Sequence, residues 1–410
     1  MAIRVLPSGD HALLVEVGAP EQVGALYPAL DAARLRGIGE LVPSTRTVLV
    51  TLDPSRLSLN AAERWIRGVD ALGASVAPVS SDSAPNVTRH GAPPTSIPVA
   101  DRSNDRALSQ LTVLDPGVLA LVQDRGRPGL AHLGISAAGA MDRAAHNLAN
   151  RLVGNDPSAA TLELLLGGFS ATVDSPVWFA VTGAWGALTL DGRPVEPHTA
   201  TRAAAGSVLR IGAATDGLRY YLAVRGGIAV NPVEGSRSRD TLAALGPAPV
   251  VAGDILPVGP VPETRIPSVD LVPVGPPDAN IALALRPGPR TDWFDEESWR
   301  RLFTTTWVAS ARADRTGVCL ELPAGCAPAR ASTTRTPPLR RTREDELPSE
   351  GMVAGAIQVS PGGYPTILTA DHPVTGVHPV IAVVTDATLD LLAQLRPGST
   401  VNFTLATGHL

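Results

Sequence analysis

The chain is poor in several features that would narrow its class. Its 410 residues include only two cysteines, Cys319 and Cys326, and aromatic residues make up 4%. Two cysteines are too few for a disulfide framework, and their spacing fits no metal site. No stretch reaches the roughly 18 apolar residues that a membrane-spanning helix needs. We therefore expect no membrane association, and a reducing cytoplasm is the expected location.

The N-terminus, the charge and the histidines exclude further classes. Pro7, Ser8, Gly9 and Asp10 precede any apolar run long enough for a secretion signal. A net charge of −5 argues against binding to nucleic acid. The eight histidines are scattered, and no HExxH or CxxC pattern occurs, so we expect no metal.

What the chain does contain indicates a folded, mainly β protein. Hydrophobic residues make up 44% and charged residues 18%, which is typical of a globular chain. The 39 glycines and 38 prolines, with abundant Val and Thr, indicate many short strands joined by turns. A chain of this length is too long for one compact core, so two or three domains are expected.

Changes of pattern divide the chain into four parts. Residues 1–78 are predicted to form a small α/β domain, residues 79–110 a linker rich in Ser, Pro and Asp, and residues 111–275 and 276–410 two mainly β domains. In the first part we expect three strands and two helices: Ala2–Pro7, Ala12–Val17, Thr47–Leu52, Pro20–Gly37 and Ala61–Leu72.

In the later parts we expect strands with three interspersed helices. The candidate strands are Leu111–Leu114, Leu119–Asp124, Ala171–Val173, Val177–Val181, Ala187–Leu190, Val208–Ile211, Tyr220–Val224, Ile255–Pro257 and Ile281–Leu285. The candidate helices are Met141–Leu152, Asp295–Leu302 and Leu389–Gln394.

Two consecutive motifs suit the binding of a small anion. In Asp124–Gly129 (DRGRPG), Arg125 and Arg127 flank a glycine that allows close backbone approach, and a guanidinium forms a planar fork for a carboxylate or phosphate. A strand-end turn whose arginines pair with surface acids is the alternative. The second motif, Gly134–Asp142, places small residues before a helix, where free backbone N–H groups could cradle an anion. It is not a P-loop, because no lysine follows.

Further polar residues lie in unusual settings. Asn147 and Asn150 are three apart on one helix face, which hints at a polar contact. Glu163 lies in an apolar run and needs a partner, for which Arg125 and Arg225 are candidates. Arg225 also precedes two glycines, which repeats the theme of arginine beside small residues.

The segment Glu346–Val359 is the strongest late feature. Ser349 and Glu350 lie at a proline turn before a strand, and Glu350 could act as a general base or hold an arginine. Asp371 lies on a later loop. Glu350 and Asp371 are our candidate catalytic residues, and the candidate substrate-binding residues are Arg125, Arg127, Asn147, Arg225 and Ser349. We expect Arg125, Arg127, Arg225 and Glu350 to approach one cleft.

These motifs occur in an order that resembles allophanate hydrolase subunit 2, a family also known as the C subunit of 5-oxoprolinase or as biotin-dependent carboxyltransferase-like proteins. The matching segments include Leu121–Gly129, Gly134–Asn155, Gly235–Thr241, Glu346–Val359 and Ala370–Pro379. Separately, Ile3–Pro54 resembles the start of allophanate hydrolase subunit 1, which corresponds to the B subunit of 5-oxoprolinase, without the cyclophilin-like domain that normally follows. The chain thus resembles a truncated subunit 1 fused to subunit 2.

The resemblance implies a fold and several functions. It implies two cyclophilin-like β-barrel domains after the small α/β domain. It also implies ATP-dependent opening of 5-oxoproline to glutamate with the A and B subunits of 5-oxoprolinase as partners, ATP being bound by the assembled complex, and a small carboxylate or amide as substrate. The alternatives are a carboxyltransferase that needs a separate biotin carrier, as in urea carboxylase, and a regulatory partner of a histidine-kinase inhibitor.

The sequence departs from the family pattern at two further places. Pro323–Pro338 is predicted to be an inserted loop. His372-Pro373-Val374 stands where the family more often has arginine and polar residues.

Overall fold

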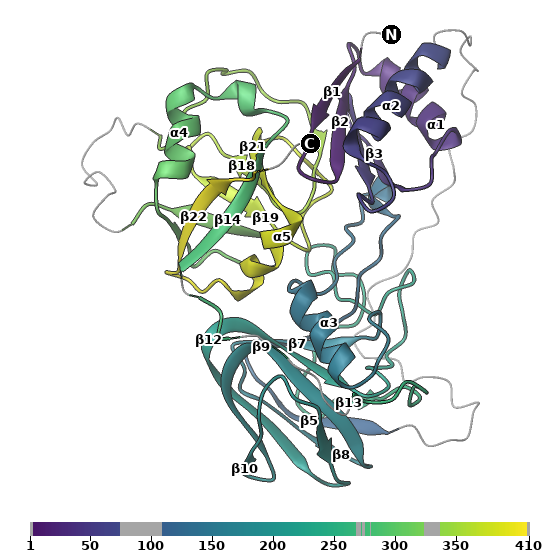
Figure 1. Cartoon of the computed structure of the whole chain (residues 1–410), viewed down its shortest axis with the longest axis vertical. Coiled ribbons are helices and arrows are strands. Elements are labelled where there is room, and N and C mark those ends of the chain that lie inside the picture. The colour runs from purple at the N-terminus through teal and green to yellow at the C-terminus, as the bar shows by residue number, and fades with distance from the viewer. Residues whose placement is uncertain are drawn as a thin grey trace.

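A computed structural model describes residues 3–73, 109–267, 272, 275–278, 280–323 and 337–407. Three β structures dominate it (Figure 1): a four-stranded sheet with two helices, a nine-stranded sheet and a closed seven-stranded barrel. We name them the small sheet, the half-barrel sheet and the barrel. The mainly β fold predicted from the sequence is confirmed, including the small α/β part at the N-terminus.

The small sheet has the strand order β1-β2-β4-β3, all antiparallel. Its strands are β1 (Arg4–Pro7), β2 (Ala12–Glu16), β3 (Ile38–Pro43) and β4 (Thr47–Leu52), and its helices are α1 (Glu21–Ala32) and α2 (Leu59–Gly73). The central strands are apolar at successive positions because both faces are covered. Leu13 and Val15 pack toward the helices, and Ala12 and Leu14 pack against residues of the barrel.

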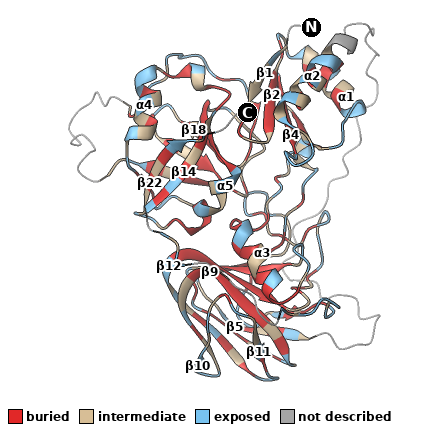
Figure 2. Ribbon diagram, in the orientation of Figure 1, coloured by how far each residue is buried: buried red, intermediate tan, exposed pale blue. Residues whose placement is uncertain are grey.

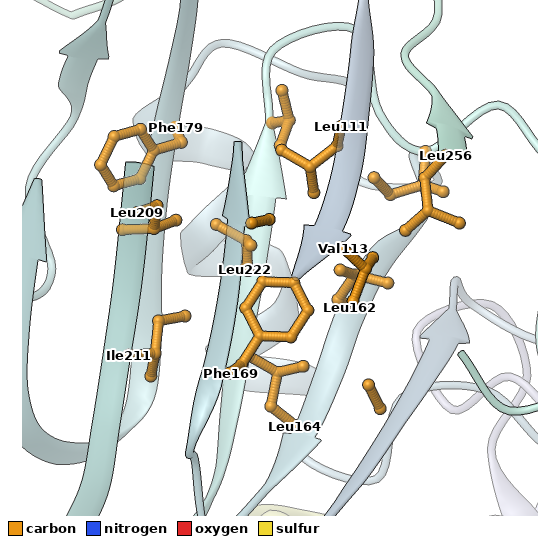
Figure 3. Close-up of a cluster of buried hydrophobic side chains, with 14 of the residues drawn as sticks. Leu111, Val113, Leu162, Leu164, Phe169, Phe179, Leu209, Ile211, Leu222 and Leu256 are labelled. Carbon is orange, nitrogen blue, oxygen red and sulfur yellow. The ribbon is translucent and has the colours of Figure 1, made fainter. Parts of the chain in front are cut away.

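The half-barrel sheet is built around two long strands, β9 (Val177–Leu190) and β12 (Val208–Val224), which pair over most of their length. The other strands are β5 (Gln110–Pro116), β6 (Leu119–Gln123), β7 (Thr161–Leu165), β8 (Phe169–Val173), β10 (Arg193–Pro194), β11 (Thr201–Ala203) and β13 (Ile255–Pro257). Leu111, Phe169, Phe179 and Leu222 are among the side chains that fill its core (Figure 3).

The barrel closes in the order β14-β21-β18-β19-β16-β15-β22, and the closing pair β14/β22 is parallel. Its strands are β14 (Asn280–Pro287), β15 (Trp307–Ala309), β16 (Gly317–Glu321), β18 (Ala356–Val359), β19 (Pro365–Leu368), β21 (Val380–Val384) and β22 (Thr400–Leu405). Helix α4 (Glu296–Thr304), α5 (Asp386–Leu389) and the 3-10 helices η2 (Thr291–Trp293) and η3 (Asp390–Gln394) belong to the same part. Figure 2 shows that buried residues concentrate on the strands of all three structures.

Helix α3 (Arg143–Leu152) covers one face of the half-barrel sheet at the side that approaches the barrel (Figure 1). Its apolar face, Ala145, Ala149 and Leu152, packs on the sheet. The contacted sheet residues include Tyr221 and the small residues Ala180 and Ala223. Asp142 is its N-cap, since its Oδ1 accepts the amide of Ala145 at 2.8 Å. The helix predicted over Met141–Leu152 therefore begins two residues later than expected, at Arg143.

The small sheet rests on the barrel through an apolar contact. Leu14, Val42 and Leu49 pack against a barrel cluster that includes Met352 and Val383. Gly351, in the short pair β17 (Glu350–Gly351) and β20 (Thr375–Gly376), lies directly against Leu49 and leaves no room for a side chain. The two structures are therefore closely packed.

Several predicted elements need correction. Strand β3 was missed, and the helix expected over Pro20–Gly37 ends at Ala32. The two separate pairs of strands expected near residues 177–190 and 208–224 are the single long strands β9 and β12. The helix expected at Leu389–Gln394 is a 3-10 segment preceded by α5. Residues 79–108 of the predicted linker, and most of the loop Pro323–Pro338, lie outside the described residues.

Candidate functional site

A cavity of about 120 Å³ lies between the start of α3 and the barrel. One side is formed by the loop before α3, and the other by the segment after β19 and by the α5–η3 region. It is lined by Ala137, Ala138, Ala140, Met141, Arg143, Ala354, Thr369, Ala370, His372, Leu389 and Leu392. Concave sites with mostly apolar walls and a few polar groups are typical of small-molecule binding.

The cavity loop, residues 136–140, is held in an unusual backbone conformation. Ala138 has φ +52°, a left-handed value that costs a non-glycine residue free energy. The loop packs back to back on the arginine-rich turn. A side chain at Gly126 would collide with the carbonyl of Ala137, and one at Gly139 would lie 2.9 Å from the backbone of Arg125. The two glycines are needed for this close approach.

The same contact is fixed by hydrogen bonds. The amide of Arg127 donates to the carbonyl of Ala137 at 2.7 Å, and the amide of Ala140 donates to the carbonyl of Asp124 at 2.9 Å. Asp124 accepts the hydroxyls of Ser236 and Ser238 and stabilises its own turn through the amide of Gly126. The turn and the cavity loop are therefore held together as one packed unit.

Arg315, just before β16, is the polar centre of the contact between the barrel and the half-barrel sheet. Its guanidinium binds both oxygens of Asp371, at 2.9 and 2.7 Å, and Oε1 of Glu163 at 2.7 Å. It also donates to the carbonyl of Gly139 at 2.6 Å. Thr241 donates to Asp371 through its amide and hydroxyl. Arg315 thus positions the cavity loop.

Glu163 is 3% exposed and accepts several donors at once. Besides Arg315, it receives the amide of Met141 at 3.0 Å and the hydroxyl of Tyr221 at 2.7 Å, and Arg219 lies 3.5 Å away. Burial alone would raise the pKa of Glu163, but these guanidiniums and hydrogen bonds hold it below its usual value. The predicted need for a partner is confirmed, but the candidates named from the sequence, Arg125 and Arg225, were wrong, since Arg315 and Arg219 take this place.

His372 is the titratable ring that lines the cavity. Its Nδ1 lies 2.9 Å from the carbonyl of Pro373. Because a carbonyl only accepts, Nδ1 carries the proton, and Nε2 is the acceptor nitrogen of the neutral ring. Burial lowers the pKa of His372, against smaller opposing effects of the Pro373 carbonyl and the charges of Asp371 and Asp240. The imidazole is therefore neutral near pH 7.

None of the site residues predicted from the sequence is among the residues that line the cavity. Arg125 is exposed, whereas Arg127 is buried and donates to the carbonyl of Ser238. Arg225 donates to the carbonyls of Val153 and Pro262, and Asn147 is half-buried on α3. No hydrogen bond between described residues joins two of the four residues expected to share a cleft, and their convergence stays a prediction.

The two candidate catalytic carboxylates both hold arginines. Glu350 binds Arg290 through both oxygens, and Arg290 also binds Glu16 of the small sheet at 3.0 Å. The carbonyl of Ser349 accepts the hydroxyl of Ser44, again across to the small sheet. Asp371 lies between Ala370 and His372, which line the cavity. Direct catalytic roles for Glu350 and Asp371 stay predictions.

Sequence reasoning missed Arg315 and Arg290 entirely, and it mentioned His372 only as a departure from the family pattern. An arginine isolated between a turn and a strand carries no local pattern that marks it. Among the described residues, no group of three His, Cys, Asp or Glu side chains is placed to hold a metal ion. None of the helices described is long and apolar enough to cross a membrane.

Comparisons with known proteins agree with this architecture. The family model "Carboxyltransferase domain, subdomain A and B" matches residues 133–405, and "Carboxyltransferase domain, subdomain C and D" matches residues 3–99. Over 296 residues the chain is 33% identical to the C subunit of 5-oxoprolinase from Escherichia coli strain K12, covering 72% of this chain and 90% of that protein.

Two solved structures are similar over large parts of the chain. The K. lactis urea amidolyase is 28% identical with a TM-score of 0.66, covering 74% of this chain and 19% of that one. The protein TTHA0988 is 24% identical with a TM-score of 0.76, covering 98% of this chain and 100% of that one, and at this identity it shows a shared fold alone. The resemblance found in the sequence is confirmed at the level of the family: the chain belongs to the family of the carboxyltransferase domain, subdomain A and B.

Proposed function

We propose that the chain is a component of a 5-oxoprolinase-type enzyme, which opens the cyclic amide 5-oxoproline to glutamate at the expense of ATP. The observation that carries this proposal is the 33% identity over 90% of the C subunit of 5-oxoprolinase. The small cavity within the matched part of the chain suits a small amide or carboxylate substrate. Because that relative is one subunit of its enzyme, we propose partners of the A and B kind, and we propose a cytoplasmic location.

The N-terminal part is proposed to be a truncated counterpart of the B subunit of 5-oxoprolinase that is fused to the rest. The match of residues 3–99 to subdomain C and D supports this reading. So does its docking, because Arg290 of the barrel joins Glu16 of the small sheet to Glu350.

We assign ATP binding to the assembled complex. The loop Gly134–Asp142 lacks the lysine of a P-loop, and the chain as given contains no lysine at all. The amides of Ala144 and Ala145 at the start of α3 already bind Asp390 and Asp142. These residues do not suit a triphosphate, so a partner is the better candidate.

The test is ATP-dependent release of glutamate from 5-oxoproline by the purified chain, alone and with candidate A and B subunits. We expect little or no activity from the chain alone and turnover that rises by orders of magnitude in the complex, because positioning alone contributes about 7–11 kcal/mol to lowering a barrier. Full activity of the isolated chain would contradict the proposed dependence on partners, and inactivity in every combination would contradict the function.

The second candidate is a carboxyltransferase that accepts a carboxyl group from carboxybiotin. The fold shared with urea amidolyase favours it. Biotin is attached through lysine, and the chain has none, so a separate carrier protein would be needed. Carrier-dependent loss of carboxyl from carboxybiotin on addition of this chain, with no glutamate release from 5-oxoproline, would support this candidate over the first.

A further inference from the structure

The cavity loop exposes two backbone N–H groups for which the described part of the chain offers no partner. The carbonyl of Ala137 accepts the amide of Arg127, and the carbonyl of Gly139 accepts Arg315. The amide of Ala140 is bonded to Asp124. The amides of Ala138 and Gly139, between these fixed points, have no hydrogen bond to any described residue.

The direction of these two amides follows from the planar trans peptide, in which the C=O of one residue and the N–H of the next point to opposite sides. The carbonyl of Ala137 points at the arginine-rich turn, and that of Ala138 also lies on the side of Gly126. The N–H groups of Ala138 and Gly139 therefore point away from that turn. We place the cavity on this other side, because Ala138 and Ala140 line it and no residue of the arginine-rich turn does.

The wall of the same cavity also includes a hydrogen-bond acceptor, the Nε2 atom of His372. The ring of His372 is in its wall, and Nε2 is the nitrogen left without a proton. Ala138 and His372 both line this space of about 120 Å³, and Gly139 lies between the lining residues Ala138 and Ala140. Arg143 also lines it, but Asp386 and Asp390 each bind its guanidinium at 2.7 Å.

We propose that the amides of Ala138 and Gly139 and the imidazole of His372 form a subsite that recognises the amide group of a lactam; this rests on the proposed function. The two N–H groups donate to the lactam oxygen, and Nε2 accepts the ring N–H. A lactam ring forces its amide to be cis, which places N–H and C=O on the same edge, whereas an open-chain trans amide has them on opposite edges. The subsite therefore selects small cyclic amides over open-chain ones.

The ligand arm of the test uses calorimetric titration of the full chain, without ATP or partners. The probes are 5-oxoproline, N-methyl-5-oxoproline, which lacks the ring N–H, and proline, which lacks the carbonyl. We expect 5-oxoproline to bind at least about tenfold more tightly than either analogue, since the N-methyl compound loses the hydrogen bond to Nε2 and proline loses the oxygen that accepts both amides. Absence of 5-oxoproline binding, or equal binding of the N-methyl analogue, overturns the proposal.

The variant arm separates His372 from a merely structural histidine. His372→Phe should reduce the preference over the N-methyl compound to about onefold, and His372→Gln, which keeps an acceptor oxygen, should retain part of it. The matched control is His378→Phe, a half-buried histidine nearby that does not line the cavity. An unchanged preference in His372→Phe contradicts the assignment.

The amide arm requires no substitution. In the wild-type chain labelled with ¹⁵N-alanine and ¹⁵N-glycine, 5-oxoproline should shift the Ala138 and Gly139 amide resonances more than that of Ala140, which is already bonded. Shifts that spare Ala138 and Gly139 overturn their role. Lactam binding without ATP-dependent turnover would refute the proposed function but not the subsite. ATP-dependent turnover that His372→Phe leaves unchanged would refute the subsite but not the proposed function.

Discussion

Two buried arginines join the three β structures, and they differ in how completely their partners are enclosed. At the junction between the barrel and the half-barrel sheet, the side chains of Arg315, Glu163 and Asp371 are 4%, 3% and 0% exposed. At the junction between the barrel and the small sheet, Arg290 and Glu350 are equally buried, but Glu16 is 28% exposed. The first junction is closed, whereas the second opens to water on one side.

The two buried glutamates show what this difference does. Burial raises the pKa of both, but two guanidiniums reverse the shift at Glu163. At Glu350 the pKa stays raised, because burial outweighs Arg290 and the nearby charge of Glu16 acts against ionisation. The stability of the closed junction therefore depends on its ionised groups. At the open junction, Glu350 can be neutralised by a proton, and the Glu16 side chain can rotate into water.

Replacing the central arginine of the closed junction should have the largest effect. Arg315→Met leaves Glu163 and Asp371 buried without their main counter-charge, which we expect to lower the free energy of unfolding by about 3–5 kcal/mol. It should also free the carbonyl of Gly139 and weaken lactam binding. Urea titration measures the first effect. The control is Arg312→Met, whose side chain is 75% exposed nearby; equal losses in the two variants would refute the role of burial.

Arg290→Met should be less damaging than Arg315→Met, with a loss of about 2 kcal/mol. Glu350 can take up a proton, and Glu16 can be solvated, so neither carboxylate is left as a buried charge. The same urea titration measures the loss. Arg4→Met is the matched control, because Arg4 contacts the same Glu16 at 3.8 Å but is 53% exposed. A loss as large as that of Arg315→Met would show that the open junction is not more tolerant.

The sequence predicts the parts of this architecture that local patterns encode. Strands β5, β6 and β13 were located because short apolar runs stand between turn residues. Strands of the barrel part such as β19 and β20 were missed, because two to four residues beside Pro and Gly carry no readable period. Their pairing is set by contacts with distant strands.

In the candidate site too, contacts between residues far apart in the sequence could not be predicted from local patterns. The need for a partner at Glu163 could be predicted from a carboxylate in an apolar run. Its partner Arg315 stands 152 residues later, and nothing local distinguishes it from the other arginines. The close packing of Gly126 on the cavity loop likewise depends on the folded chain, although the glycines themselves stood out in the sequence.

Asp142 is another buried carboxylate at the closed junction. Unlike Glu163 and Asp371, it has Gln394 and a backbone amide as its donors, not an arginine. Burial raises its pKa from 3.8 to about 6, although Gln394 and the amide of Ala145 donate to it. The folded state thus binds this proton more tightly than the unfolded state, and the associated stability is present below about pH 4 and is lost as the pH rises through about 6.

Asp142→Asn, which cannot ionise and still caps α3, should remove that dependence. Relative to the wild type, its free energy of unfolding should improve by about 1 kcal/mol between about pH 5 and pH 7.5. Urea titrations of both proteins at the two pH values measure this. Asp191→Asn serves as the control, because Asp191 is solvated and its pKa is lowered. A difference that does not change with pH at Asp142→Asn would contradict the raised pKa.

The smallest effect is expected at a third arginine that crosses the same boundary as Arg315 but at the surface. Arg143 of α3 binds Asp386 and Asp390 of the barrel part, each at 2.7 Å, and is 45% exposed. Water and salt screen such pairs, so Arg143→Ala should lower the free energy of unfolding by no more than about 1 kcal/mol, and about 0.5 M salt should remove most of the difference. Arg67→Ala, which breaks an exposed pair within α2, controls for the loss of a surface ion pair that crosses no boundary. Because Arg143 and Arg315 join the same two structures, a loss at Arg143 close to that at Arg315, or one insensitive to salt, would mean that the boundary itself, and not the burial of the charges, sets the cost.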